Sequence, residues 1–575
     1  SVEAEVFRFI SSPFKMKSAA AILLLNVAQA QQAGTLKKEN NPALSFSTCD
    51  ESGCQSQDRF VTIDSNWRWT HQKGQPVNCY TGNDWNKTVC PDPKTCSQNC
   101  VIDGADEEYK GTYGVKASGN KLELDFVTQG PYSKNVGSRT YLLDASKEKY
   151  EMFKLKNREF TFDVDVSNMP CGVNGALYFV QMDADGGKSK YSNAGAQYGT
   201  GYCDAQCPHD LKWINGEANI GNWTPQKTDP NAGLGHYGSC CTELDMWEAN
   251  SISQAYTMHS CSVDGQTRCE GVDCGDNAGA VTPDAHRFEG VCDKNGCDFA
   301  TNRLGEKSFY GPGMEVDTTK PFTVVTQFVT DNGADDGKVN EVRRFYVQDG
   351  KKIETPTVTL QGNTYDSITT EFCQDWVATT KDGTNFIQKG GFDAVDSALE
   401  KGVVLVMSLW DDHFANMLWL DSIYPTDSSD STNYRGSCSK DSGVPKDIET
   451  KDAKSHVIFS NIKAGKIGST TGDSPSPSPS PSPSPSPSSG CCSWDGKYCG
   501  KTTDYCGANA EQCEDCKGNW CTDCAAPYTT AAPATTTAGG DCPGGSLSAC
   551  LADCPAAIYK ECAASCAARC SSLLV

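Results

Sequence analysis

The chain has 575 residues and a formal net charge of −23, from 50 Lys and Arg against 73 Asp and Glu. This acidity argues against nucleic acid and anionic membranes as partners, because both are bound by positively charged surfaces. The 32 Cys are too many for a protein of the reducing cytosol and indicate an oxidising, secretory environment.

The N-terminal 30 residues are interpreted as two segments that precede the mature protein. Residues 1–15 show no usable periodicity and are interpreted as upstream, non-native sequence. Residues 16–30 combine a charged start, a short apolar run and an Ala-Gln-Ala cleavage site, which is typical of a secretory signal peptide. An anchor helix is the alternative, but the run is far shorter than the ~20 apolar residues that cross a bilayer. We therefore predict an extracellular protein that begins at Gln31.

From Gln31 to Thr470 the pattern is that of a large β domain. Short stretches alternate polar and apolar residues with the period of a half-buried strand, and Gly, Asn, Asp and Pro clusters separate them. The pattern predicts strands at 159–166, 176–182, 323–329 and 403–409, and a helix at 392–401. Many strands and few helices over this length predict an all-β, curved antiparallel β-sandwich with long surface loops. Its 18 Cys allow nine disulfides.

Three carboxylates lie within six residues, at Glu243, Asp245 and Glu248. On a strand Glu243 and Asp245 share a face, and a β-bulge before Glu248 would bring it to the same face. The carboxyl gap then approaches the ~5–5.5 Å of a retaining glycosidase. Because carboxylates this close cannot all stay ionised, the pKa of one should rise, as an acid catalyst requires, while its partner stays anionic. A solvated acidic strand face and a calcium site are the alternatives, although calcium would need more oxygen ligands than these three.

The sequence around the three carboxylates resembles a known enzyme family. The run at 238–253, Gly-Ser-Cys-Cys-Thr-Glu-Leu-Asp-Met-Trp-Glu-Ala-Asn-Ser-Ile-Ser, is similar to the catalytic strand of glycoside hydrolase family 7, the fungal cellobiohydrolases and endoglucanases that act on cellulose. Further matching stretches are 65–71, 174–178, 202–207, 408–412 and 416–421. The resemblance covers nearly all of 31–470 and implies a concanavalin-like jelly roll whose long loops form a substrate tunnel.

The resemblance also implies roles for individual residues. Glu243 corresponds to the nucleophile, Glu248 to the general acid and base, and Asp245 to the residue that orients the nucleophile. His259 matches a histidine close to the catalytic centre, although a lone His beside Cys is more often structural. Substrate contacts along the tunnel are implied for Trp67, Trp69, Arg139, Asn174, Tyr178, Tyr202, Asp204, Gln206, Lys212, Arg287, Asp298, Arg303, Trp410, Trp419, Tyr424 and Arg435. Such tryptophans suit sugars, because the C–H face of a pyranose stacks on an aromatic ring.

Loop length indicates how such an enzyme would attack its polymer. The segments 223–237, 275–303 and 369–391 keep the long loops that roof the tunnel in cellobiohydrolases, although His413-Phe414 replaces the usual Tyr-Tyr of the family. We predict a processive, monomeric cellobiohydrolase that binds cellulose and cello-oligosaccharides from the reducing end, releases cellobiose and needs no cofactor or metal. An endoglucanase of the same family and, from another class, a non-catalytic glucan-binding lectin are the alternatives.

The C-terminal hundred or so residues read as tethered small modules. Residues 471–489 carry seven Ser-Pro repeats and predict an extended spacer of the polyproline-II kind. The block 490–524 has eight Cys and several aromatic residues, which suggests a disulfide-stapled carbohydrate-binding module. Its Cys-x-x-Cys pairs allow a zinc module as the alternative, against which secretion argues.

The chain also contains a second linker, a last Cys-rich block and two candidate sites of sugar attachment. Residues 525–541 read as a Thr/Ala/Pro linker, and 542–575 as a Cys-rich helical hairpin to which no role is assigned. The sequons at Asn86 and Asn222 predict a glycoprotein if the host attaches N-glycans.

Overall fold

The computed structural model describes residues 31–276, 286–471, 491–493 and 519–521. The chain divides into two compact units, Ser1–Pro475 and Ser476–Val575. In the second unit, β35 (Cys491–Ser493) pairs antiparallel with β36 (Asn519–Cys521). The predicted signal peptide, both linkers, the last Cys-rich block and most of the block 490–524 lie outside the described residues.

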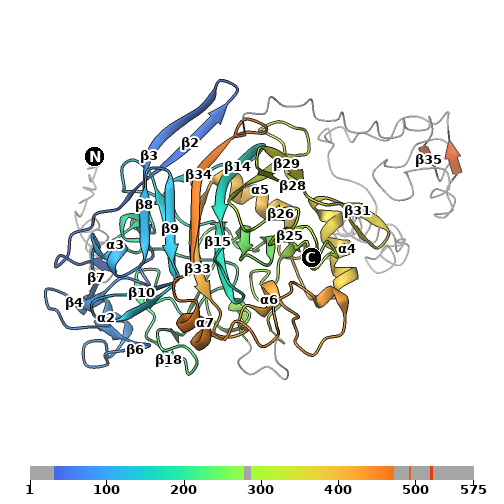
Figure 1. The fold of residues 1–575 in the computed structure, drawn as a ribbon. Coiled ribbons are helices and arrows are strands. Elements are labelled where there is room, and N and C mark those ends of the chain that lie inside the picture. The colour runs from blue at the N-terminus through green and yellow to red at the C-terminus, as the bar shows by residue number, and fades with distance from the viewer. Residues whose placement is uncertain (1–30, 277–285, 472–490, 494–518, 522–575) are drawn as a thin grey trace, which may run out of the picture. The chain divides into compact units, whose positions relative to one another are not determined.

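The first unit is built on a system of seventeen hydrogen-bonded strands (Figure 1). These strands are β2 (Ala43–Asp50), β3 (Gly53–Ile63), β8 (Val115–Ser118), β9 (Lys121–Asp125), β12 (Ser138–Leu143), β13 (Met152–Phe153), β14 (Arg158–Asp165), β15 (Val173–Val180), β21 (Glu243–Ala249), β22 (Gln254–His259), β24 (Cys297–Phe299), β27 (Phe322–Thr330), β28 (Val339–Gln348), β29 (Lys351–Glu354), β32 (Ser367–Thr369), β33 (Val403–Asp411) and β34 (His456–Lys466). Every predicted strand is confirmed, within a few residues at its ends.

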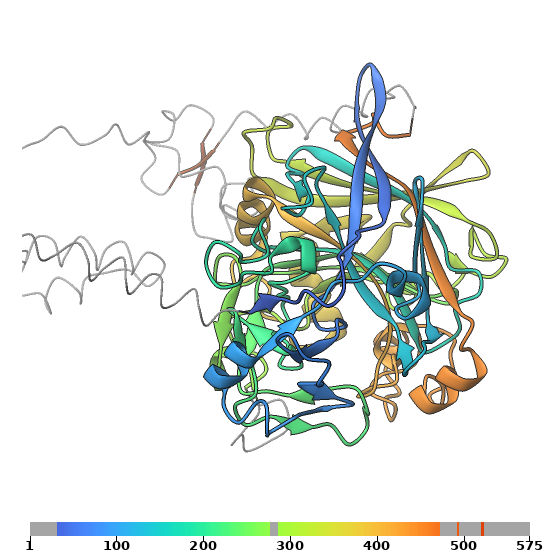
Figure 2. The same cartoon turned by 90° about the vertical axis from the view of Figure 1, so that its left-hand side faces the viewer.

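The pairings arrange these strands in two layers. One layer runs β3-β12-β33-β15-β21-β22-β24, and the other runs β8-β9-β34-β14-β27-β28, with β29 and β32 beside β28. All these pairings are antiparallel. Strand β2 links the two layers, because it pairs antiparallel with β3 in one layer and parallel with β34 in the other. Together β2 and β3 form the long blue hairpin that projects from the body in Figure 2. The predicted antiparallel sandwich is confirmed.

The core lies between the layers. Phe160 on β14 meets Phe179 on β15 with ring centroids 4.9 Å apart, and Phe162 meets Trp247 on β21 at 6.2 Å. On β15, Leu177 and Phe179 join this core, whereas Ala176 and Tyr178 point to the other face of the sheet. The strand period of two therefore leaves one face of β15 and β21 free to form a site.

Smaller pairs of strands shape the loops around the sandwich. They are β1 (Gln32–Ala33), β4 (Thr70–Gln72) and β7 (Cys100–Ile102) in one sheet, and the pairs β5 (Tyr80–Thr81) and β6 (Asp84–Trp85), β10 (Val127–Gln129) and β11 (Lys134–Val136), β16 (Trp213–Ile214) and β17 (Glu217–Ala218), β18 (Thr224–Pro225) and β19 (Gly233–Leu234), β20 (Gly238–Cys240) and β23 (Thr267–Cys269), β25 (Tyr310–Gly311) and β26 (Val316–Asp317), and β30 (Val358–Leu360) and β31 (Asn363–Tyr365).

The helices of the described residues are short, and the sequence predicted only one of them. They are α2 (Pro93–Asn99), α3 (Glu108–Gly111), α4 (Thr370–Thr380), α5 (Gly391–Lys401), α6 (Leu418–Asp421) and α7 (Pro445–Lys451). Helix α5 confirms the predicted helix, but α4 occupies the first half of the segment 369–391, which the sequence predicted to be a loop. Thr369 caps α4 by accepting a hydrogen bond from the Phe372 amide, and Phe372 and Trp376 bury its inner face. No helix in the described ranges has the length and apolar character needed to cross a bilayer.

Nine disulfides pair all the Cys between residues 31 and 470, as their even number predicted. The pairs are Cys49–Cys54, Cys79–Cys100, Cys90–Cys96, Cys171–Cys438, Cys203–Cys241, Cys207–Cys240, Cys261–Cys292, Cys269–Cys274 and Cys297–Cys373. The bridges of Cys203 and Cys207 clamp the segment between them to the start of β21. This segment is therefore held against the strand that carries the three carboxylates.

Candidate active site

A bulge in β21 brings the three carboxylates to one face. The register of β21 against β22 shifts between Asp245 and Glu248, where two residues of β21 lie opposite a single residue of β22. Leu244 and Met246 stay in the core, whereas Glu243, Asp245 and Glu248 line a cavity on the outer face of the sheet. The bulge predicted from the spacing is confirmed, and with it the gathering of the carboxylates.

Asp245 forms an ion pair with His259, which lies opposite Glu243 on the neighbouring strand. The Asp245 carboxylate lies 3.0 Å from His259 Nε2, and His259 Nδ1 lies 2.9 Å from the carbonyl oxygen of Asp293. Burial alone would lower the pKa of His259, but the hydrogen bond and charge of Asp245 raise that pKa to about 9. His259 therefore stays protonated at neutral pH and presents its positive charge to the Asp245 carboxylate.

Glu243 and Glu248 are held by different donors. The Ala205 amide donates to Glu243 Oε2 over 2.9 Å, from the segment that the two disulfides clamp against β21. The Asn174 side-chain amide donates to Glu248 Oε1 over 3.0 Å, and the Asn174 oxygen accepts from the Ala249 amide. Each carboxyl is thus fixed from a separate, rigid piece of the fold.

The pKa of both glutamates is raised. Burial and the charges of Asp245 and Asp204 hold the pKa of Glu243 well above its usual value, against the hydrogen bond from Ala205. Burial and the charge of Asp245 raise the pKa of Glu248 to about 8. The sequence predicted that the pKa of only one carboxyl would rise. Both pKa values rise because all three carboxyl groups are buried close together. The negative charge of one carboxylate therefore disfavours ionisation of its neighbours.

This crowding should make the stability of the fold depend on pH at Glu248. A carboxyl with a raised pKa in the folded state favours folding below the pKa of the unfolded chain, near 4.5, and loses that contribution as pH rises toward about 8. We therefore expect Glu248→Gln to leave stability nearly unchanged at pH 4 and to stabilise the fold by about 1–3 kcal/mol at pH 7. Thermal melts of both proteins at the two pH values check this. Equal shifts at pH 4 and pH 7 would contradict the raised pKa.

The same carboxylates do not form a good metal site. Ligand atoms of Glu243, Asp245 and His259 lie within 4.8 Å of one another. However, both ring nitrogens of His259 already have partners, Asp245 and the Asp293 carbonyl, so the imidazole would have to break one of these contacts to bind an ion. The arrangement favours proton transfer over metal binding, which disfavours the calcium alternative.

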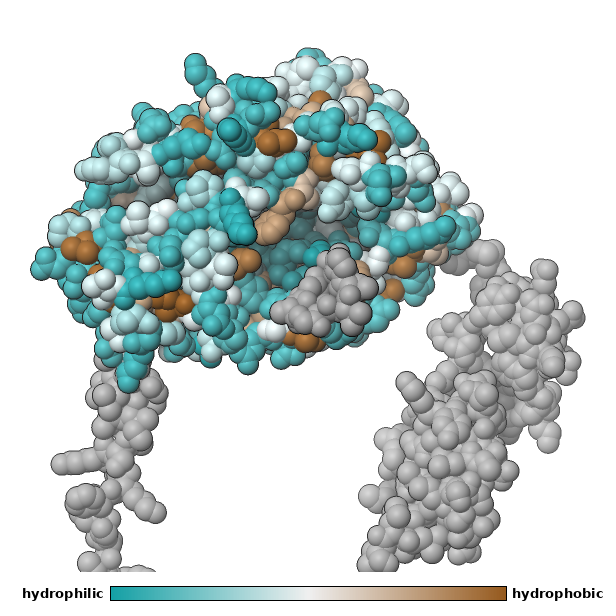
Figure 3. Space-filling view, turned by 90° about the horizontal axis from the view of Figure 1, so that it is seen from below, coloured by the Kyte–Doolittle hydropathy of each residue, from teal (hydrophilic) through white to brown (hydrophobic). Residues whose placement is uncertain are grey.

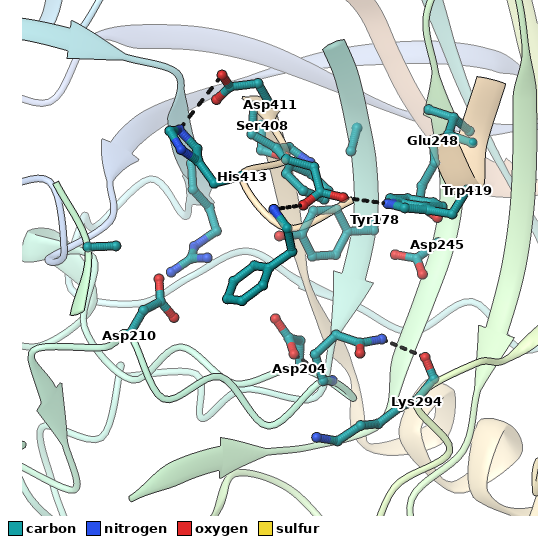
Figure 4. A pocket seen from close by; sticks show the side chains of 18 of the residues that line it. Tyr178, Asp204, Asp210, Asp245, Glu248, Lys294, Ser408, Asp411, His413 and Trp419 are labelled. Carbon is teal, nitrogen blue, oxygen red and sulfur yellow. Dashed lines mark hydrogen bonds and ion pairs between the residues drawn. The ribbon is translucent and has the colours of Figure 1, made fainter. Parts of the chain in front are cut away.

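The cavity is a long hollow of about 1190 Å³. Figure 3 looks onto the hollowed, largely hydrophilic face. In Figure 4, Asp245, Glu248 and Trp419 lie on one side, Asp411 and His413 on the other, and Tyr178 between them. The loops predicted to roof a tunnel contribute to the lining through Asp229, Phe288 and Asp382. The segment 277–285 of one of these loops lies outside the described residues.

Most of the predicted contact residues share this cavity. Besides the four catalytic candidates, the lining includes Trp67, Arg139, Tyr178, Tyr202, Asp204, Gln206, Lys212, Arg287, Asp298, Arg303, Trp410, Trp419, Tyr424 and Arg435. Two predicted residues are absent from the lining. Asn174 is buried behind it, bonded to Glu248, and Trp69 stacks on His71 with ring centroids 4.0 Å apart.

A network of hydrogen bonds on the cavity wall ends beside the amide that contacts Glu243. The Tyr178 and Tyr202 hydroxyls lie 2.8 Å apart, and Tyr202 donates to Asp204 over 2.7 Å. Asp204 in turn accepts from the Gln206 amide, one residue beyond the Ala205 amide that contacts Glu243. Burial raises the pKa of Asp204. This network fixes polar groups where sugar hydroxyls would need partners.

Two aromatic platforms are also fixed by polar contacts. Trp410 and Trp419 lie with ring centroids 6.1 Å apart, and Trp419 Nε1 donates to Asp412 over 2.9 Å. Trp67 donates to the Gly137 carbonyl over 3.1 Å and has the Arg139 guanidinium 5.4 Å from its ring centroid. The rings therefore keep their orientation without a ligand, which lowers the entropy cost of stacking a sugar on them.

The lining also includes residues that the sequence did not single out. Among them are Asn66, Tyr80, Asp210, Lys294, Asn295, Asp382 and Ser408. Asn66 and Ser408 lie inside stretches that carried the resemblance, so position could have indicated them. Lys294 and Asp382 lie on loops where no periodic pattern shows which side chains point inward.

Comparison with known proteins gives a consistent result. The family model described as Glycosyl hydrolase family 7 matches residues 33–471. An exoglucanase, GH7B, from Limnoria quadripunctata is 53% identical over 460 residues, which cover 79% of this chain and 99% of that protein.

Solved structures agree. A cellobiohydrolase of the same family from Daphnia pulex is 53% identical, with a TM-score of 0.75, over 76% of this chain and 100% of its own. A cellobiohydrolase from Melanocarpus albomyces, solved with cellotetraose, is 45% identical with a TM-score of 0.71, over 76% of this chain and 99% of its own.

Proposed function

Because the chain belongs to glycosyl hydrolase family 7 and is therefore a cellulase, we propose that it is a secreted cellobiohydrolase. It cleaves β-1,4-glucosidic bonds with retention of configuration. It moves along cellulose from the reducing end and releases cellobiose. The observation that carries the proposal is the bulge that places Glu243, Asp245 and Glu248 on one cavity wall. The cellobiohydrolase names of its similar structures support the choice of product.

In this mechanism the two glutamates act on opposite sides of the scissile bond. Glu248, with its pKa near 8, carries the proton that the leaving oxygen needs at mildly acidic or neutral pH. Glu243 attacks the anomeric carbon as its anion, which the Ala205 hydrogen bond favours against the burial and the neighbouring carboxylates that raise its pKa. Water then releases the sugar from Glu243, with Glu248 now acting as base. Asp245, paired with His259, orients Glu243 and stabilises positive charge that develops on the sugar.

Contacts between loops support the exo mode. His413 Nδ1 lies 2.8 Å from the carbonyl oxygen of Thr228, which joins the loop after β33 to the loop of residues 223–237. Asn295 donates to the Gly383 carbonyl, which joins two further long loops. Segments from different parts of the chain thus meet around the cavity, as a tunnel requires. An endoglucanase of the same family would need a cleft open enough to admit the middle of a chain.

The products released over time from crystalline cellulose test this proposal. We expect cellobiose as the dominant soluble product from the first minutes, with little change in the viscosity of a soluble cellulose derivative. Rapid loss of viscosity with mixed oligosaccharides would favour the endoglucanase, and release of no sugar at all would favour the lectin.

Extracellular location and glycosylation remain proposals that the sequence supports. The predicted signal peptide and the nine disulfides are consistent with secretion. Of the two sequons, Asn222 is exposed, whereas Asn86 is half-buried and donates its side-chain amide to the Asn78 carbonyl. We therefore propose Asn222 as the glycan site and a monomer as the working form.

The C-terminal modules are proposed to anchor the enzyme on solid cellulose. A chain truncated after Thr471 keeps the hydrogen bonds of Thr470 to Glu159, so the catalytic unit should fold. We expect truncation to weaken binding to crystalline cellulose by about tenfold or more, because a tethered second site is lost. Turnover of a soluble cello-oligosaccharide should stay the same. Depletion assays on solid cellulose measure this, and undiminished binding would remove the module's proposed role.

A further inference from the structure

Lys294 is a cation inside the cavity that the mechanism above does not use. It lines the cavity, is half-buried, and forms no hydrogen bond or ion pair through its ammonium group with any described residue. Figure 4 shows its side chain on the same side of the cavity as Asp204. Most lysines of this acidic chain that lie near a carboxylate do so at the surface, as Lys188 does with Glu148. An ammonium group without a carboxylate partner in a concave site is therefore available to bind an anionic ligand.

Disulfides fix the chain on both sides of Lys294. Cys292 is bridged to Cys261, two residues beyond His259, and Cys297 is bridged to Cys373 in α4. The Lys294 carbonyl accepts a hydrogen bond from the Gln206 side chain over 2.6 Å. Lys294 also follows Asp293, whose carbonyl contacts His259. Its side chain is therefore projected from a rigid segment directly beside the catalytic group.

The charges nearby leave Lys294 as the unmatched cation. Arg303 pairs with Asp298 at 3.3 Å and with Asp382 at 2.8 Å, and Arg435 shares Asp382 at 3.2 Å. The Asn295 side chain, next to Lys294, donates a hydrogen bond to the carbonyl of Gly383, next to Asp382, so these groups lie close together in the cavity lining. Among the described residues, Arg303 and Arg435 thus have carboxylate partners, whereas the Lys294 ammonium has none.

Burial and the charge of Arg287 lower the pKa of Lys294, whereas Asp276 and Asp204 favour its charged form. Asp276 lies 3.0 Å from His209, and Asp204 is bonded to Tyr202. Both carboxylates thus have other partners, and neither forms an ion pair with Lys294. An anion that enters the cavity would relieve the repulsion between Lys294 and Arg287 and restore the lost solvation.

From this arrangement we propose that Lys294 binds the carboxylate of an oxidised cello-oligosaccharide, so that the enzyme accepts glucan chains whose reducing-end sugar is an aldonate. Arg287 and Arg435, which the family resemblance matches to the arginines that hold the cellobiose product, line the same cavity as Lys294. A reducing-end carboxylate would therefore enter a part of the cavity already rich in cations. A reaction that oxidises the anomeric carbon of cellulose is the class that would supply such ends. The inference rests on the proposed function, because it concerns the same cavity.

Competitive inhibition of aryl β-lactoside hydrolysis tests the proposal with three probes. The probes are cellobiose, cellobionate with the carboxylate at the reducing end, and cellobiose carrying a C6 carboxylate on its non-reducing sugar. Above about pH 5 both acids are ionised. At low salt we expect Lys294→Met to raise the inhibition constant of cellobionate about tenfold and that of cellobiose less than twofold, because one charge-assisted hydrogen bond is lost. Lys294→Arg should restore most of the cellobionate affinity.

Two controls separate this effect from loss of structure. Lys351→Met removes an exposed lysine on β29 and should change neither constant. In the unaltered enzyme, the ratio of the cellobiose to the cellobionate constant should fall as salt rises. Equal shifts of both disaccharides in Lys294→Met, or a ratio insensitive to salt, would overturn the proposal. A Lys294-dependent preference for the C6 acid would overturn the reducing-end assignment, and no hydrolysis of any β-glucoside would overturn the proposed function instead.

Discussion

Replacing Glu243 with glutamine should reduce cellulose hydrolysis by at least about a thousandfold while leaving the fold and substrate binding in place. Glutamine has the shape of the carboxyl group and can still meet the Ala205 amide through its oxygen, but it cannot attack the anomeric carbon as an anion. Removing one carboxyl from the crowded group also relieves repulsion on Asp245 and Glu248. Loss of activity would therefore not reflect loss of stability.

The measurement is the rate of cellobiose release, beside the affinity for a cello-oligosaccharide by calorimetry. A matched control is Glu315→Gln, which makes the same chemical change at an exposed position outside the cavity. The control should retain full activity. A Glu243→Gln enzyme with turnover within tenfold of the parent would exclude Glu243 as the nucleophile.

Replacing Glu248 with glutamine should produce a loss that depends on the leaving group. Glutamine can keep the hydrogen bond from Asn174 only by presenting its oxygen, and it carries no proton that a leaving sugar can take. Cellulose, whose leaving group is a poor one, should be cleaved about 10²–10⁴-fold more slowly. An aryl glycoside with an acidic phenol leaves without protonation, so formation of the glycosyl-enzyme should be much less affected.

Pre-steady-state kinetics on an activated aryl β-cellobioside check this difference. The variant should show a burst of phenol followed by slow turnover, because Glu248 also acts as the base in the second step. A uniform loss on cellulose and on the aryl substrate would show that Glu248 acts through structure and not through proton transfer.

The catalytic strand shows how far the sequence alone could lead. The spacing of Glu243, Asp245 and Glu248 required a bulge if the three were to act together, and the bulge is present where the spacing placed it. The alternation of 159–166 and 323–329 was enough to predict β14 and β27, because half-buried strands expose their period directly.

Other features depend on distant parts of the chain. Helix α4 had a signal, a Thr cap followed by buried residues at helical spacing, but it lay inside a segment read as loop. The raised pKa of Glu243 depends on Asp204, which belongs to a segment clamped to β21 by disulfides. Lys294 gave no signal, because only folding reveals which loop side chains lack a partner.

The configuration of the first product tests the central claim most directly. Proton NMR of cello-oligosaccharide hydrolysis, recorded before mutarotation is complete, distinguishes the two anomers of the released reducing end. If Glu243 forms a glycosyl-enzyme that water opens with the help of Glu248, the β-anomer appears first and the α-anomer grows only by mutarotation. Initial release of the α-anomer would require a single displacement by water and would contradict the roles assigned to both glutamates.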